Sequence, residues 1–254
     1  MPVALPEEAI VATAASAEDH GYSSFWLNNP PNTHALAPLG RAAQYTATIW
    51  LGVGIIPLSH HQPAEIVREV EQNDLPLNRF YPGIGSGPGG GGVERVAEGI
   101  RVIRSQLQGR LVVAALGPRM CRLAGAAADG ALLNWLTPQF AQASIEWVRE
   151  GAREADRPMP RLMAYVRAAL GDEAITRLQR EAASYEAIPH YAAHFRRMGV
   201  SAMDTTITGV TPEDIQRGLS EWDGVVDEVV VRAVTAQDTV DDIRQILEAA
   251  KPAH

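Results

Sequence analysis

The chain has 254 residues, 46% of them hydrophobic, and a formal net charge of −8, a composition that suits a globular protein with a sizeable core. The acidic balance and the lack of a basic stripe argue against a nucleic-acid surface and against a patch for anionic membranes. No apolar run reaches the roughly 18 residues that cross a bilayer, no secretory signal is recognisable, and Cys121 is the single cysteine, so we expect a cytoplasmic protein.

Short runs of apolar and β-branched residues alternate with longer segments of helical spacing along the chain. The predicted strands lie at residues 3–5, 24–27, 49–58, 79–85, 111–116, 131–136, 162–170 and 226–234. The predicted helices lie at residues 7–20, 35–46, 63–73, 93–107, 118–128, 138–153, 172–198 and 239–250, with another that starts at Pro212. The pattern of residues 200–207 fits either a strand or a helix.

Strands that alternate with helices predict a parallel sheet. Eight strand–helix units in 254 residues match an α/β fold of the (β/α)8 type, the TIM barrel, in number and in size. An open doubly wound sheet is the alternative, and it normally contains fewer units. No shift in composition divides the chain, so we expect one barrel domain over residues 1–254.

In such a barrel, functional residues lie where strands end and loops begin. The residues at the predicted strand ends are 28–29, 54–61, 83–87, 116–119, 134–137, Arg167 and Arg232. One of these ends opens an unusual stretch, because seven of the ten residues from Gly83 to Gly92 are glycine. Such a stretch could be a cradle for a cofactor or only a slack connector.

Four segments at these strand ends resemble, in order, those of the bacterial-luciferase-like family of flavin and deazaflavin enzymes. They read WLGVGIIPL (50–58) with HQPA (61–64), RF (79–80) with GIGSG (83–87), AALGPRM (114–120) continuing to ADG (128–130), and NWLTP (134–138). The resemblance covers about residues 15–138 and returns near 226–234. It is greatest to the branch that uses coenzyme F420.

The resemblance implies a TIM barrel that binds F420, or alternatively FMN, and transfers a hydride to or from a small organic substrate. It also implies a homodimer. An FMN-dependent monooxygenase on the same barrel is one alternative. Another is a shortened barrel that has lost cofactor binding and acts as a binding or scaffold protein. The substrate itself is not indicated by the sequence.

The resemblance also assigns cofactor contacts. A cis peptide bond at Gly54–Ile55 would form a bulge behind the ring. The other implied cofactor contacts are Asn28, Gly85, Ser86, Gly87, Ala115, Leu116, Gly117, Pro118, Arg119 and Asn134. Of these, Gly117–Arg119 would bind the phosphate, because a helix N-terminus offers unpaired N–H groups and partial positive charge. An ordinary strand–helix turn with a surface arginine is the alternative reading.

Three residues are candidates for catalysis. His60 and His61 follow a strand end and could position a substrate or donate a proton, since histidine titrates near neutral pH; they could instead form a polar loop that caps the next helix. Asn29 could contact the ring or the substrate but cannot act as a base. We expect no metal site, although His190 and His194 are four residues apart, because a third ligand is lacking; we expect a solvated helix face there. Cys121 is expected to be buried.

The sequence departs from the family at two strand ends. The second strand usually ends in an acidic residue followed by histidine, and here Asn28 and Asn29 replace them. The fourth strand end is usually followed by polar residues and a longer insertion, and here Pro88 and four glycines replace these. The usual acid or base is therefore not visible, and residues 88–92 look like the remnant of a longer loop.

Overall fold

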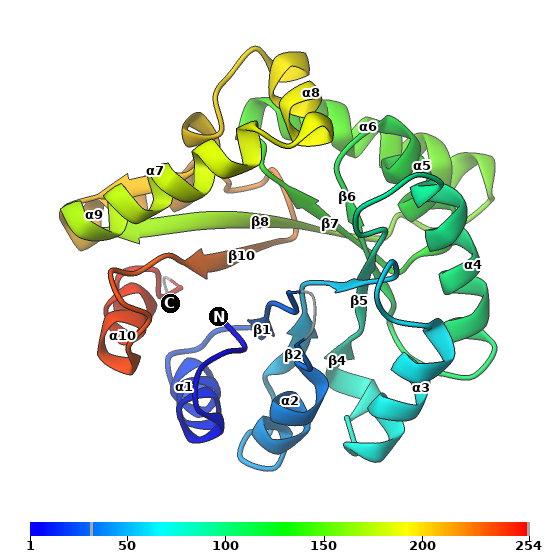
Figure 1. Ribbon diagram of the computed structural model, residues 1–254, viewed down its shortest axis with the longest axis horizontal. Helices are drawn as coiled ribbons and strands as arrows, with labels where there is room; N and C mark the ends of the chain where they lie inside the picture. The colour runs from blue at the N-terminus through cyan, green and yellow to red at the C-terminus, as the bar shows by residue number, and fades with distance from the viewer. Residues whose placement is uncertain (31–32, 253–254) are drawn as a thin grey trace. The chain divides into compact units, whose positions relative to one another are not determined.

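Figure 1 shows the computed structural model, which describes residues 1–30 and 33–252. The chain divides into two compact units. Unit 1 contains Met1–Leu132 and Trp147–Arg161, and unit 2 contains the described residues of Leu133–Glu146 and Leu162–His254. The expectation of one domain over residues 1–254 stays a prediction.

Unit 1 alternates strands and helices in the predicted order. Its elements are α1 (Glu7–Asp19), β1 (Ser24–Leu27), α2 (Leu36–Ala43), β2 (Trp50–Val53), β3 (Ile56–Pro57), α3 (Pro63–Gln72), the 3-10 turn η1 (Leu77–Arg79), β4 (Phe80–Tyr81), β5 (Gly83–Gly85), α4 (Gly92–Arg104), β6 (Val112–Ala115) and α5 (Pro118–Ala127). All of its strand pairs are parallel: β2 lies between β1 and β4, and β5 lies between β3 and β6. Because parallel strands end at one edge, the loops after these strands are neighbours.

Unit 2 is built around one long strand. The elements β7 (Gly130–Asn134) and α6 (Pro138–Glu154) run from one unit into the other, and β8 (Arg161–Leu170), α7 (Asp172–Glu186), α8 (Pro189–Met198), the 3-10 turn η2 (Met203–Thr205), β9 (Ile207–Gly209), α9 (Pro212–Ser220), β10 (Glu228–Ala233) and α10 (Val240–Ala249) follow. Ala168 of β8 pairs with Ala233 of β10 and with Ile207 of β9, so these two strands lie on opposite edges of β8.

Prolines explain most differences from the predicted elements. Residues 3–5 form a turn and not a strand, because Pro2 lacks an N–H donor and Pro6 is already the N-cap residue that precedes α1. The predicted strand 79–85 is interrupted at Pro82 for the same reason. The predicted helix 172–198 is two helices, since Pro189 begins α8 and the residue before a proline avoids helical backbone angles.

Two charged side chains fix the turn that leads into β2. The guanidinium of Arg79 donates hydrogen bonds to the backbone oxygens of Ala43, Thr46 and Ile49 at 2.8–2.9 Å. The carboxylate of Glu18 accepts from the backbone nitrogens of residues 47–49 at 2.6–3.1 Å. Burial raises the pKa of Glu18, but these hydrogen bonds outweigh it and lower the pKa to about 2. In this turn, backbone oxygens therefore balance the charge of Arg79 and backbone N–H groups balance the charge of Glu18.

Candidate functional site

The predicted cis peptide bond is present. Gly54 and Ile55 are joined in the cis form, and this bond separates β2 from β3 where one continuous strand was predicted. The side chain of Ile55 lies on the backbone of β5: a Cβ on Gly85 would be 2.7 Å from Ile55 Cδ1. A Cβ on Gly83 would be 2.0 Å from the backbone oxygen of Val53. The glycines of β5 therefore let the bulged backbone pack directly against it.

The rest of the glycine stretch is an exposed loop that one arginine holds. Gly87, Gly89 and Gly91 have φ angles of 66°, 95° and 68°, which glycine adopts without strain. Arg95 of α4 donates from Nη1 to the Ser86 oxygen at 2.9 Å and from Nη2 to the Gly90 oxygen at 2.8 Å. The stretch is thus a packed strand end followed by a loop that hydrogen bonds hold in place. It is not a slack connector.

Ser59 lies below the start of this loop. A Cβ on Gly87 would be 2.0 Å from Ser59 Oγ, and this oxygen is buried without a hydrogen-bond partner among the described residues. Ser59 lies in the predicted strand-end segment 54–61, but the sequence indicates no role for it and none for Arg95. Both act through tertiary contacts, so no local pattern could have indicated these roles.

Asn29 and His61, from different strand ends, lie against each other. Asn29 is 5% exposed, its Oδ1 accepts from the backbone nitrogen of Ala35 at 2.8 Å, and its Nδ2 lies 3.3 Å from His61 Nε2. Because Oδ1 is engaged by an N–H group, the amide turns its donor toward the imidazole. His61 Nε2 is therefore an acceptor, and the proton of the neutral ring is on Nδ1.

This arrangement favours the neutral imidazole. Burial lowers the pKa of His61, with His34 and His60 acting in the same direction and Glu65 and Glu69 opposing it. His60 is exposed and its backbone nitrogen donates to Pro57 at 3.0 Å, so the two predicted histidines differ in environment. Of the pair, His61 alone has a defined polar partner among the described side chains. Asn28 instead accepts from the backbone nitrogen of Val3 at 3.0 Å and fixes the N-terminal turn.

The start of α5 has no side-chain cap. Gly117 is the N-cap residue and Pro118 opens the helix, whose first turn contains no acidic residue. The first backbone nitrogen bonded to an oxygen of this turn is that of Cys121, which donates to Gly117 at 2.9 Å. The N–H groups of Arg119 and Met120 therefore point out of the helix end without an intrahelical acceptor. The Arg119 side chain is exposed and pairs with Glu94 at 2.9 Å.

In unit 2, Asn134 and the next residue lie against a buried arginine. Arg167 Nη1 donates to Asn134 Oδ1 at 2.9 Å, and the Arg167 guanidinium lies 3.5 Å from the ring centroid of Trp135. Arg167 also donates from Nε to Glu181 at 2.7 Å. The sequence placed Arg167 and Asn134 at strand ends, but it gave no signal for Glu181, which is one of many polar residues on a long helix.

One expectation for unit 2 is wrong. His194 is not on a solvated helix face: it is 1% exposed, and its Nε2 lies 2.7 Å from the backbone oxygen of Trp135. The reason is that α8 turns this side toward the aromatic cluster of Trp135 and Phe195. His190 is exposed as expected, and Cys121 is buried as expected. Among the described residues, no group of three His, Cys, Asp or Glu side chains is arranged to hold a metal ion.

Comparison with known proteins decides the family. A sequence profile described as "Luciferase-like monooxygenase" matches residues 93–251, more than half of the chain. The chain belongs to this family. The resemblance seen at the strand ends is thereby confirmed. Within the described residues, no helix is long and apolar enough to cross a membrane.

Solved structures of the family share the fold. An F420-dependent secondary alcohol dehydrogenase in complex with an F420–acetone adduct is 15% identical with a TM-score of 0.75, over 98% of this chain and 96% of that one. The coenzyme F420-dependent tetrahydromethanopterin reductase from Methanopyrus kandleri is 18% identical with a TM-score of 0.73, over the same shares. The FMN complex of the oxygenating constituent of 3,6-diketocamphane monooxygenase from Pseudomonas putida is 13% identical with a TM-score of 0.68, over 96% and 91%. The predicted TIM-barrel fold of the luciferase-like type is confirmed.

Proposed function

We propose that this member of the luciferase-like family is an F420-dependent oxidoreductase that transfers a hydride between the coenzyme and a small organic substrate. The observation that carries the proposal is the uncapped start of α5, in a family whose solved members include F420 and FMN enzymes. By the same resemblance, we propose that the protein is a cytoplasmic homodimer.

The start of α5 fits a phosphate group. Two N–H groups and the positive end of the helix dipole point away from Gly117, and no carboxylate of the first turn competes for them. Two helices of unit 2 differ in this respect. Thr211 and Thr239 cap α9 and α10 by accepting hydrogen bonds from the third residue of each helix, and both first turns are acidic. Those helix starts supply their own acceptors, whereas α5 leaves room for an external one.

The strand ends of unit 1 fit a flat ring. The segment with the cis bond at Gly54–Ile55 packs against Gly85, and the Ser59 hydroxyl, which has no hydrogen-bond partner among the described residues, lies against Gly87. When bound, F420 or FMN would supply a ring that accepts or releases hydride. His61, held neutral with its proton on Nδ1, would position the substrate by donating a hydrogen bond, and Asn29 would keep it in that form. The other contacts proposed for the cofactor are Asn28, Ala115, Leu116, Pro118, Arg119 and Asn134.

An FMN-dependent monooxygenase is the second candidate, because the FMN complex of 3,6-diketocamphane monooxygenase shares this fold. Yellow colour on purification and turnover that needs oxygen would favour it. A barrel that has lost cofactor binding is the third candidate, and the failure of both cofactors to bind would favour that reading.

Isothermal titration with F420 and with FMN tests the proposal. We expect one of them to bind well below millimolar concentration. In the Gly117→Asp variant, a carboxylate would cap α5 and occupy the phosphate position, so we expect affinity to fall about tenfold or more while the protein stays folded. The matched control is Pro6→Asp, which caps α1, a helix that also lacks a side-chain cap. The proposal fails if wild-type protein binds neither cofactor, or if both variants bind like wild type.

A further inference from the structure

A cluster of polar side chains within unit 2 has a charge that its own residues do not balance. Its members come from four elements, β7, β8, α7 and β10, and are Asn134, Trp135, Tyr165, Arg167, Glu181 and Arg232. Arg167 and Arg232 are partners in the parallel register of β8 and β10, so their side chains leave the same face of the sheet. We call this group the arginine cluster.

The arginine cluster has a net charge of +1. The Glu181 carboxylate accepts from Arg167 Nε at 2.7 Å and from Arg232 Nη2 at 3.2 Å, so one acid serves two guanidinium groups. The acid Asp238, whose field also reaches Arg232, is already bonded to Arg177. The side chains of Arg167 and Arg232 are only 3% and 15% exposed. A positive charge held away from water without a full counter-charge is costly.

The unmet hydrogen-bonding groups of the cluster are donors. A guanidinium has five N–H donors and no acceptor, and an indole has a single donor. In the part of the chain that the structure describes, Trp135 Nε1 is buried without a partner, and the bonds of Arg167 leave its Nη2 without one. Burial raises the pKa of the Tyr165 hydroxyl, so this group also keeps its proton.

We propose that the arginine cluster is a binding site for the oxyanion of a small molecule, a carboxylate or a phosphate. The N–H groups of Trp135 and Arg167 that have no partner among the described residues are donors, the missing charge is negative, and a planar guanidinium matches the geometry of such oxyanions. The Trp135 ring lies against Arg167 and fixes the plane of its guanidinium. The site lies within unit 2 and goes beyond the proposed function, because it stands on the charge of these residues and not on cofactor binding.

Thermal unfolding in different salts tests the site directly. Wild-type protein is measured in sodium phosphate, sodium acetate and sodium chloride at equal ionic strength and pH. An anion that binds the folded state stabilises it in proportion to its occupancy. We expect phosphate or acetate to raise the melting temperature above its value in chloride, in a saturable way. If neither anion exceeds chloride, the proposal is overturned.

Three variants separate a binding site from a structural ion pair. Arg232→Gln should weaken anion binding about tenfold, since it removes a charge-assisted donor. Glu181→Gln should tighten anion binding about tenfold, since this change removes the competing negative charge. Arg180→Gln is the matched control on α7, because this arginine is exposed and is not a member of the arginine cluster, and it should leave anion affinity unchanged. A purely structural role predicts no tightening in Glu181→Gln, and that result would contradict the proposal.

Should Glu181→Gln fail to fold, the comparison of Arg232→Gln with Arg180→Gln decides, and equal anion affinity in these two variants would overturn the site. Titration of Arg232→Gln with F420 and FMN then identifies the occupant. A loss of cofactor affinity would show that an anionic group of the cofactor occupies the site, and unchanged affinity would assign it to a substrate anion. If neither cofactor binds wild-type protein, the proposed function fails while the salt experiment still tests this site.

Discussion

In unit 1, the candidate residues are fixed mainly by backbone groups and close packing, whereas in unit 2 they are fixed by charged and aromatic side chains. Gly83 and Gly85 let a cis bulge pack on β5, and Arg95 bonds only to backbone oxygens. Arg167, by contrast, depends on Glu181, Asn134 and the Trp135 ring. Backbone groups and close packing suit contact with a flat ring, whereas charged side chains suit recognition of an opposite charge, so the two units offer different kinds of contact.

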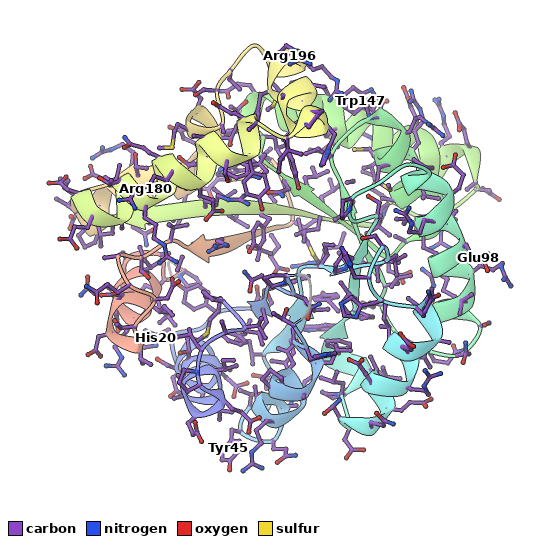
Figure 2. All side chains as sticks on the ribbon, in the orientation of Figure 1. His20, Tyr45, Glu98, Trp147, Arg180 and Arg196 are labelled. Atoms are coloured by element: carbon purple, nitrogen blue, oxygen red, sulfur yellow. The ribbon has the colours of Figure 1, made fainter. Side chains whose placement is uncertain are left out.

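The largest expected effect tests whether charged side chains stabilise the candidate residues of unit 2. Arg167→Met should lower the free energy of unfolding by about 3 kcal/mol, because it removes the buried hydrogen bonds to Glu181 and Asn134 and the guanidinium that lies on the Trp135 ring. Urea denaturation measures the change. Arg101→Met is the control: Arg101 pairs with Glu98, which is labelled on α4 in Figure 2, and because both side chains are exposed we expect little or no loss of stability. Equal losses in the two variants would show that burial of Arg167 is unimportant.

The next prediction tests the packed backbone of unit 1. Gly83→Ala should cost about 2 kcal/mol, because its Cβ would be 2.0 Å from the backbone oxygen of Val53 and the strand would have to shift. Gly90→Ala is the matched control in the same glycine stretch, because its Cβ would meet no atom within 4 Å. We expect that change to stay within about 0.5 kcal/mol. A neutral Gly83→Ala would show that the contact can relax.

Asn29→Asp introduces charge into unit 1. A carboxylate facing Nε2 should raise the pKa of His61 from below its ordinary value to above it, because it stabilises the imidazolium. In wild type the unfolded chain binds the proton more readily, so this histidine makes stability fall as the pH drops below its ordinary pKa. In the variant the sign reverses: the contribution is present below the ordinary pKa and is lost as pH rises through the folded pKa.

NMR titration of the His61 ring measures this change without reference to activity. Asn29→Ala should leave the pKa low, because burial remains. An unchanged pKa in Asn29→Asp would contradict the contact between the two side chains.

The smallest expected effect concerns Glu18, whose charge is balanced by backbone N–H groups. Glu18→Gln should cost about 1 kcal/mol at neutral pH, allowing for the exposure of the group. The folded pKa is lowered to about 2, so the contribution is present above the ordinary pKa of 4.5 and is lost as pH falls toward 2. Denaturation of both proteins at pH 7 and near pH 2 checks whether the difference disappears.

The parts of the site that depend on local sequence were predictable. Glycine at strand ends, Pro118 after Gly117 and the cis bond at Gly54–Ile55 follow from a motif or from local chain chemistry. Ser59, Arg95 and Glu181 were missed, because their roles come from residues distant in sequence or from tertiary packing. His194 was misjudged, since a spacing of four residues shows that two side chains share a helix face but not which environment that face meets.

The two hydrogen bonds of Arg95 determine which substitutions the loop after β5 can accept. The guanidinium binds the oxygens of Ser86 and Gly90, which are atoms that every amino acid provides. New side chains at Gly90, where the surroundings are open, would leave both hydrogen bonds intact. Gly90 is therefore the natural place for an engineer to graft a functional side chain beside the strand end without rebuilding the scaffold.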